Sequence, residues 1–140
     1  ISDISKKLLE EADEVLEAYS LYIANKSDKR LEHLIEELFD VCQACYTMSI
    51  NKDINLDVRN TAVACTVDTY INLHFTSVVH MYKANGGYMA QDKHLKATLE
   101  DITEVCEKAI NMLCYKHEIS FYDMYSKHVC KLKKRNLNVL

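Results

Sequence analysis

Apolar residues recur every three or four positions over most of this chain, which is the spacing of an α-helix that buries one face. Two such segments come first, at residues 3–24 and about 29–50, joined by the short polar stretch 25–28. Helices joined by so short a connection pack as an antiparallel hairpin. The predicted buried stripes are Ile4, Leu8, Ala12, Val15, Tyr19 and Ile23 in the first helix, and Leu31, Leu34, Leu38, Val41, Cys42 and Cys45 in the second.

The same spacing predicts three further helices. A third runs over about 56–83, a fourth over about 93–116, and a last one starts near Ser120 and ends near Lys134. Between the third and fourth lies the one strong break, at 84–88, which contains the only two glycines of a chain without proline. The pattern predicts an all-α antiparallel bundle of about four to five helices.

Length and composition indicate one globular domain over 1–140. Hydrophobic residues make up 49% of the 140 residues and charged residues 27%, which is typical of a soluble protein with its own core. No apolar run approaches the about 20 residues of a membrane span, and the first residues do not resemble a secretory signal. We therefore expect a cytoplasmic protein that does not contact a membrane.

The charge balance argues against direct nucleic-acid binding. The formal net charge is −4, whereas proteins that bind nucleic acids are usually basic. Basic residues nevertheless gather near the C-terminus, at Lys127, Lys131, Lys133, Lys134 and Arg135.

The six cysteines do not form a recognisable metal set. Cys42 and Cys45 have C-x-x-C spacing inside a predicted helix, and no second pair or adjacent histidines complete a zinc site. We expect buried free thiols that act as small apolar residues in a reducing cytosol. A redox dithiol at Cys42 and Cys45 is the alternative, without the strand-turn-helix context that such motifs have.

Four acidic residues form two pairs at helical spacing. Glu11 and Glu14 are three residues apart in the first predicted helix, and Glu37 and Asp40 are three apart in the second. Residues three apart are neighbours on one helix face, where like charges repel each other. A divalent cation would remove that repulsion, and Mg²⁺ prefers carboxylate oxygens. The pairs predict a magnesium site, provided that the packing of the hairpin brings them together.

The two pairs belong to longer motifs, Glu10-Glu11-x-x-Glu14 and, after twenty-two residues, Glu37-x-x-Asp40. This arrangement resembles the E-E-x-x-E and E-x-x-D signature of the all-α nucleoside triphosphate pyrophosphohydrolases. That superfamily includes MazG-like proteins, phosphoribosyl-ATP pyrophosphohydrolases and dimeric dUTPases. The apolar residues around both motifs also look like MazG-type helices.

The C-terminal element Lys131-x-x-x-Arg135 is similar to the one that closes many MazG-like chains. In relatives, such residues help to hold the nucleotide phosphates. The resemblance covers residues 5–48 well and 117–136 loosely, whereas the segment 51–95 is atypical of a minimal MazG domain. The resemblance therefore does not identify the residues that would select the base.

The resemblance implies Mg²⁺-dependent hydrolysis of a nucleoside triphosphate to the monophosphate and pyrophosphate, with Mn²⁺ as a substitute. Glu11, Glu14, Glu37 and Asp40 would hold the metal, and Lys131 and Arg135 the outer phosphates. Glu10 or Glu36 would orient or deprotonate the attacking water. Family members usually pair, so the resemblance also implies a bundle that is completed by homodimerisation or a higher homo-oligomer.

Two other classes of protein compete with this reading. A di-iron carboxylate bundle needs Glu-x-x-His pairs, and no glutamate here has histidine three residues later. A non-catalytic helical interaction module, or an inactive relative of the family, would use the same acidic residues as solvated surface. Metal binding separates this module from the enzyme.

Several further residues are left with more than one interpretation. His74 and His80 are expected to be packing or surface residues, while Tyr19, Tyr22 or Tyr46 could stack on a base. The stretch 98–106 echoes 34–42, so that Asp101 and Glu104 match Glu37 and Asp40. This echo indicates a duplicated unit, a second acidic edge or a chance match.

Overall fold

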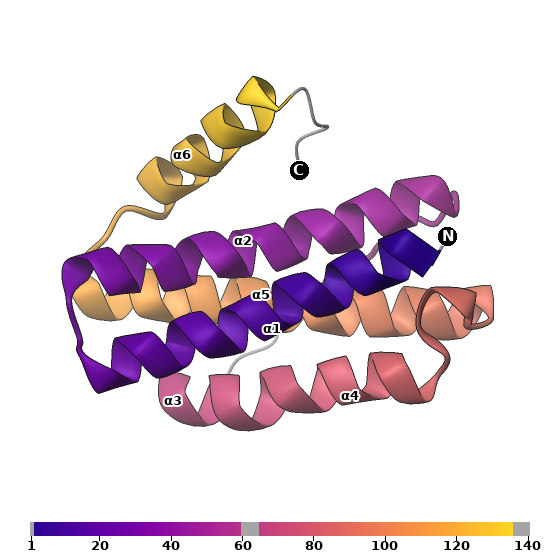
Figure 1. Ribbon diagram of the computed structural model, residues 1–140, viewed down its shortest axis with the longest axis horizontal. Helices are drawn as coiled ribbons and strands as arrows, with labels where there is room; N and C mark the ends of the chain where they lie inside the picture. Colours follow the sequence, from indigo (N-terminus) through magenta and orange to yellow (C-terminus); the bar gives the residue numbers. More distant parts are fainter. Residues whose placement is uncertain (1, 60–64, 136–140) are drawn as a thin grey trace.

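Figure 1 shows the computed structural model of the chain, which describes residues 2–59 and 65–135. Helices make up most of these residues and none of them lies in a strand, so the all-α prediction is confirmed. The elements are α1 (Ser2–Ala24), α2 (Asp28–Asn51), α3 (Val67–Thr69), the π-helix η1 (Tyr70–Phe75), α4 (Thr76–Ala84), the 3-10 helix η2 (Gly87–Met89), α5 (Asp92–His117) and α6 (Phe121–Lys134).

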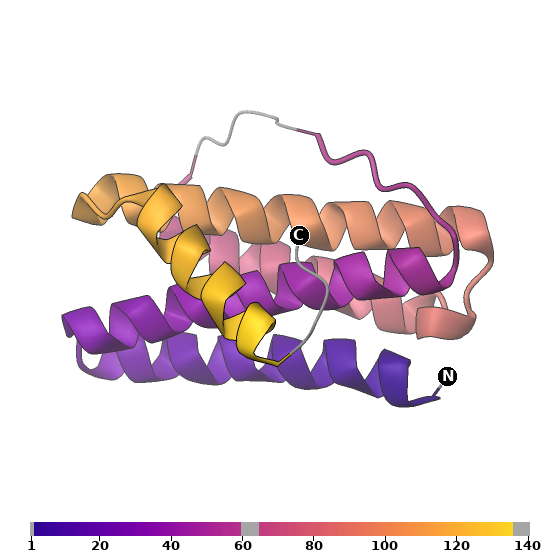
Figure 2. The ribbon, with the colours of Figure 1, turned by 90° about the horizontal axis from the view of Figure 1, so that it is seen from above.

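Four long helical stretches lie side by side and form the bundle (Figures 1 and 2). The α1–α2 hairpin packs against α5, and the continuous run α3–η1–α4 packs along the other side of α5. Helix α6 is set apart from this bundle and lies obliquely across α2 (Figure 2). Among the described helices, none combines the length and the apolar composition of a membrane span.

The hairpin buries the stripes that the sequence predicted, with one shift. All six predicted apolar residues of α2 are buried, but in α1 Ile23 is 42% exposed and Ala18 and Tyr22 point inward instead. An α-helix has 3.6 residues per turn, so a stripe drifts along the surface, and the inward position at the end of α1 falls one residue earlier. The side chain of Ile4 lies outside the described residues.

The third predicted helix is wrong in its first part. Residues 54–59 have no regular structure, and the next helix of the described residues begins at Val67. The predicted positions 60–64 lie outside the described residues. The backbone of residues 55–57 is bonded to α5 instead: Lys96 Nζ donates to the carbonyl of Asn55 at 2.8 Å, and the amide of Asp57 donates to the Glu100 carboxylate.

The break at 84–88 is confirmed. Helix α4 ends at Ala84, and Gly86 adopts φ +98°, a conformation that glycine accepts without steric cost. The start of the last helix is also as predicted, because the hydroxyl of Ser120 accepts a hydrogen bond from the amide of Asp123 at 3.2 Å. This N-cap sets where α6 begins and therefore which of its residues face α2.

Candidate metal centre

The α1–α2 connection sets the register of the two acidic pairs. Ser27 caps α2 by accepting the amide of Arg30 at 3.2 Å, and the Arg30 guanidinium donates to the carbonyl of Leu21 at 2.6 Å. Because the connection is short, Glu11 in α1 and Asp40 in α2 are almost the same number of residues away from it. The short hairpin therefore places the middle of α1 beside the acidic turn of α2.

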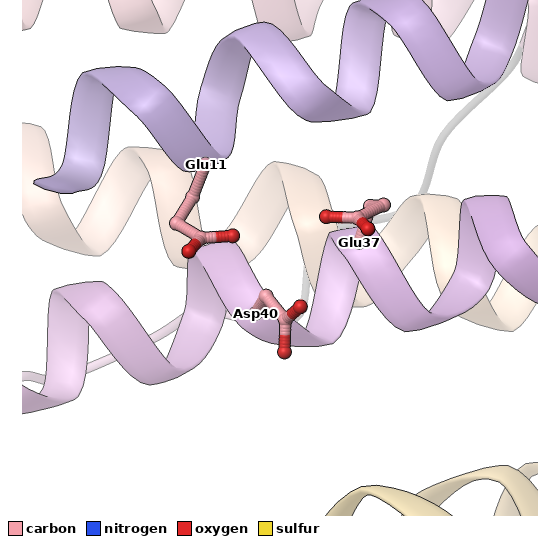
Figure 3. A group of neighbouring side chains, drawn as sticks. All are labelled: Glu11, Glu37 and Asp40. Carbon is pink, nitrogen blue, oxygen red and sulfur yellow. The ribbon is translucent and has the colours of Figure 1, made fainter.

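Three of the four predicted metal ligands come together there. One carboxylate oxygen from each of Glu11, Glu37 and Asp40 lies within 4.8 Å of the others. In Figure 3, Glu11 reaches from α1 toward the two acidic residues of α2. Glu11 and Glu37 are buried, at 6% and 9% exposure, whereas Asp40 is partly exposed. The convergence that the sequence left open is therefore present for these three side chains.

The fourth predicted ligand, Glu14, lies at the edge of this group. Its side chain is exposed, and its carboxyl forms a hydrogen bond with that of Glu37. Two carboxyl groups can share a hydrogen bond only if one of them carries a proton. Burial is the main cause that raises the pKa of Glu37 to about 8, with further contributions from this hydrogen bond and from the charges of Asp40, Glu14 and Glu11.

Basic side chains lie next to the carboxylates. Lys7 Nζ lies 2.7 Å from Glu11 Oε1, and Lys131 Nζ donates to Asp40 Oδ1 at 2.7 Å. The Nε2 atom of His33 lies 3.7 Å from Glu37 Oε1. Lys131 was predicted to hold a substrate phosphate, and this stays a prediction. In the structure its ammonium lies on Asp40, a predicted metal ligand.

His128 is a residue of this region that the sequence analysis did not single out. It is 2% exposed, its ring stacks on Phe39 with centroids 5.2 Å apart, and its Nδ1 lies 3.7 Å from Asp40 Oδ1. Neither ring nitrogen has a hydrogen-bond partner among the described residues. Burial lowers the pKa of His128, and the charges of Lys131 and Arg135 lower it further against the opposing effect of Asp40.

A signal for His128 is nevertheless present in the sequence. The buried residues of α6 are Met124, His128 and Leu132, which follow each other at four-residue spacing. A histidine in the middle of an apolar stripe is a buried polar group that needs a reason. Its neighbour in space, Asp40, is far away in the sequence and supplies that reason only once the helices are packed.

The donor set of the centre fits a hard divalent cation. Glu11 Oε2 and Glu37 Oε2 are buried and lack a hydrogen-bond partner among the described residues. Unsatisfied carboxylate oxygens are costly in a protein interior, and an oxygen-only ligand set is the one that Mg²⁺ and Mn²⁺ accept. The site residues therefore suit the predicted metal, with three carboxylates at the centre and Glu14 beside them.

The two residues predicted to activate water lie outside the three-carboxylate group. Glu10 is exposed and its charge acts on Lys7, whereas Glu36 is partly buried and its charge acts on Lys127. Arg135 caps the end of α6, is exposed, and lies near enough to His128 to affect its pKa. The catalytic role of Glu10 or Glu36 and the phosphate contact of Arg135 stay predictions.

The other candidates have contacts elsewhere in the bundle. The Tyr22 hydroxyl lies 3.1 Å from His117 Nε2, and the Tyr19 hydroxyl accepts a hydrogen bond from Asn72 at 3.4 Å. Tyr46 is partly buried, and His74 and His80 are exposed. Asp101, in the stretch that echoes 34–42, is on α5, lies 3.8 Å from Arg59 and is separate from the three-carboxylate group.

All six cysteines are free thiols. Four of them are buried, as expected for apolar packing residues, while Cys65 is partly exposed and Cys130 is exposed. Burial raises the pKa of the Cys45 and Cys106 thiols, so these side chains stay protonated near neutral pH.

Comparisons with models of protein families, with curated proteins and with solved structures found no significant match to this chain. The resemblance to the all-α nucleoside triphosphate pyrophosphohydrolases accordingly depends on the acidic motifs and on the geometry that those motifs adopt.

Proposed function

We propose that this protein is a Mg²⁺-dependent nucleoside triphosphate pyrophosphohydrolase. The observation that supports this most directly is the convergence of Glu11, Glu37 and Asp40 from two helices, with oxygens within 4.8 Å of one another. These residues come from both acidic motifs of the sequence, and the buried, unsatisfied oxygens of Glu11 and Glu37 need a partner.

In the proposed reaction, water attacks the phosphorus that is joined to the nucleoside. The bond from that phosphorus to the bridging oxygen of the next phosphate breaks, and pyrophosphate leaves with that oxygen. Glu11, Glu37 and Asp40 would hold the metal, assisted by Glu14. When bound, Mg²⁺ supplies positive charge that offsets the phosphate oxygens of the substrate. Glu10 or Glu36 would accept the proton of the water.

A panel of ribo- and deoxynucleoside triphosphates, assayed for pyrophosphate release with Mg²⁺, tests this proposal. Asp40→Asn should abolish release, because it removes a charged ligand from the centre. Asp101→Asn is the matched control, since it makes the same change of residue type on α5, outside the three-carboxylate group. Circular dichroism should show the same helical content in both variants. Full turnover by Asp40→Asn would refute the metal assignment.

A non-catalytic interaction module is the second candidate, and one observation favours it. Lys7 and Lys131 already pair with two of the three carboxylates, so the group can also act as an ion-paired network that joins α1, α2 and α6. A folded protein that binds neither Mg²⁺ nor Mn²⁺ would support this module and reject the enzyme.

Homodimerisation is part of the proposal. Large apolar side chains are exposed at several places, including Leu73 at 64%, Met81 at 48% and Leu21 at 43%. Self-association would remove such surface from water. Size-exclusion chromatography with light scattering would measure the mass of the particle, and a monomer at working concentration would contradict this part.

A further inference from the structure

Two lysines of α6 make the same kind of contact with α2. Lys127 Nζ lies 2.7 Å from Glu32 Oε1, and one turn later Lys131 Nζ lies 2.7 Å from Asp40 Oδ1. The two carboxylates differ in their surroundings. The Glu32 side chain is 41% exposed and outside the three-carboxylate group, whereas that of Asp40 is 18% exposed and belongs to it. Lys131 alone of these two lysines therefore contacts the candidate metal centre.

His128 is the independent observation that this end of α6 is built toward a ligand. His128 is 2% exposed, and its imidazole lacks a hydrogen-bond partner among the described residues. Its Nδ1 lies 3.7 Å from Asp40 Oδ1. The stacking on Phe39 holds the ring in place. The position of Lys131, three residues further along the helix, follows from this anchored ring.

The ammonium of Lys131 and a divalent cation would both use the carboxylate of Asp40. Asp40 Oδ1 accepts the hydrogen bond from Lys131, and an oxygen of the same carboxylate is the one that completes the group with Glu11 and Glu37. Lysine carries one charge on a flexible stem, so it offsets only part of the negative charge of three carboxylates. A divalent cation contacts all three at once and offsets more.

We propose that Lys131 competes with the divalent cation for Asp40, and that its release from Asp40 makes its ammonium available to the phosphates of the incoming substrate. This inference rests on the metal site of the proposed function. Lys131 would contact two partners in succession, first the carboxylate of Asp40 and then a phosphate of the substrate. Metal binding and phosphate binding are thereby coupled through one side chain, so substrate affinity depends on prior occupation of the metal site.

Titration with Mn²⁺ by calorimetry tests the competition without any turnover. Lys131→Met removes the competing charge and keeps the length of the side chain. Exposed or partly exposed ion pairs contribute at most about 1 kcal/mol, so the dissociation constant for Mn²⁺ should fall by roughly two- to sixfold. Lys127→Met is the matched control, because it removes the other ion pair between α6 and α2, and it should bind Mn²⁺ like the wild type.

Lys131→Arg completes the series. It keeps a cation at this position and should restore an affinity near that of the wild type. Unchanged or weaker Mn²⁺ binding by Lys131→Met would overturn the competition, and so would an equal gain in Lys127→Met. The failure of the proposed function is distinguishable: Mn²⁺ binding with this order of affinities, but no pyrophosphate release from any nucleotide, rejects the enzyme and leaves the competition in place.

The second half of the proposal has its own measurement. If the released ammonium contacts phosphate, Lys131→Met should bind a non-hydrolysable nucleoside triphosphate more weakly at saturating Mn²⁺, although it binds the metal more tightly. A nucleotide affinity equal to that of the wild type would show that Lys131 competes for Asp40 but does not contact the substrate.

Discussion

The imidazole of His128 lies almost parallel to the ring of Phe39, at an interplanar angle of 19°. Two other rings of α6, those of Phe121 and Tyr125, also contact Phe39, with centroids 5.6 Å and 6.1 Å away. One residue of α2 thus receives three aromatic contacts from a helix that touches the bundle on one side only. The placement of Lys131 beside the carboxylates depends on this contact.

Phe39→Ala should loosen α6. Phe39 is 3% exposed, and truncation of a buried phenylalanine to alanine costs about 3–5 kcal/mol of the free energy of unfolding. Urea denaturation measures this loss, and hydrogen exchange should show that amides of α6 lose protection first. Phe121→Ala is the control within the same aromatic cluster. Its ring is 38% exposed, so a smaller loss is expected, and an equal loss would contradict the central position of Phe39.

The raised pKa of Glu37 makes the stability of the metal-free protein depend on pH. The pKa is about 8 in the folded protein and near 4.5 without the surrounding groups. Between these values the folded state keeps a proton that the unfolded state has lost, so the free energy of unfolding falls as the pH rises from about 4.5 to 8. Urea midpoints across this range should show the decline in the wild type and a weaker one in Glu37→Gln.

The raised pKa of Glu37 also predicts how the affinity for a metal ion responds to pH. A carboxyl group must lose its proton to bind a cation, so the affinity for Mn²⁺ should rise as the pH increases toward 8 and then level off. Glu17→Gln, a change on the exposed side of α1, should leave this profile as it is. An Mn²⁺ affinity that is constant between pH 5 and 8 would place Glu37 outside the ligand set.

His128 makes the free energy of unfolding depend on pH in the direction opposite to that of Glu37. Its pKa is lowered from 6.5 in the folded protein, so the unfolded state binds a proton first as the pH falls. The stability that neutral His128 provides is therefore present above pH 6.5 and decreases below it. His128→Phe keeps an aromatic ring against Phe39 and should remove this part of the acid sensitivity. His80→Phe, which changes an exposed histidine of α4, should retain it.

Thiol labelling should follow burial. The exposed Cys130 should react with a thiol reagent in the native protein, followed by Cys65, because these two are accessible. Cys42, Cys45 and Cys106 should react only after unfolding, since burial restricts access and the raised pKa values of Cys45 and Cys106 disfavour the thiolate. Mass spectrometry of labelled peptides would identify the sites. Fast native labelling of Cys42 would favour the dithiol alternative.

The hairpin could be predicted because its signals are local. The apolar stripes of α1 and α2 depend on residues a few positions apart, and they agree with the structure except at the end of α1, where Tyr22 is buried in place of Ile23. The acidic pairs were also visible in the sequence. Which of their members would meet depended on the rotation of one helix against the other, and this excluded Glu14 from the central group while it included Glu11.

Two features could not be predicted because they depend on distant residues. The third helix was predicted to begin at about Leu56, yet the backbone amide of Asp57 is bonded to the Glu100 side chain of α5 and residues 56–59 are not helical. The pairing of Lys131 with Asp40 was likewise not visible in the sequence, because it arises from the docking of α6 through Phe39. Tertiary contacts determined both outcomes, and periodicity does not encode them.

The π-helical turn at Tyr70–Phe75 has a consequence for how the chain tolerates change. A π turn accommodates one residue more than an α turn, so every side chain after Phe75 is rotated by about 100° from where a regular helix would place it. This rotation directs Tyr82 inward, where its hydroxyl lies 3.9 Å from the sulfur of Met48. Ordinary α-helical winding with every residue kept would turn that phenol out of the core, whereas deletion of a single residue within the turn would restore ordinary winding and leave the phenol facing inward. The irregularity therefore absorbs one residue and is part of the fit between α4 and α2.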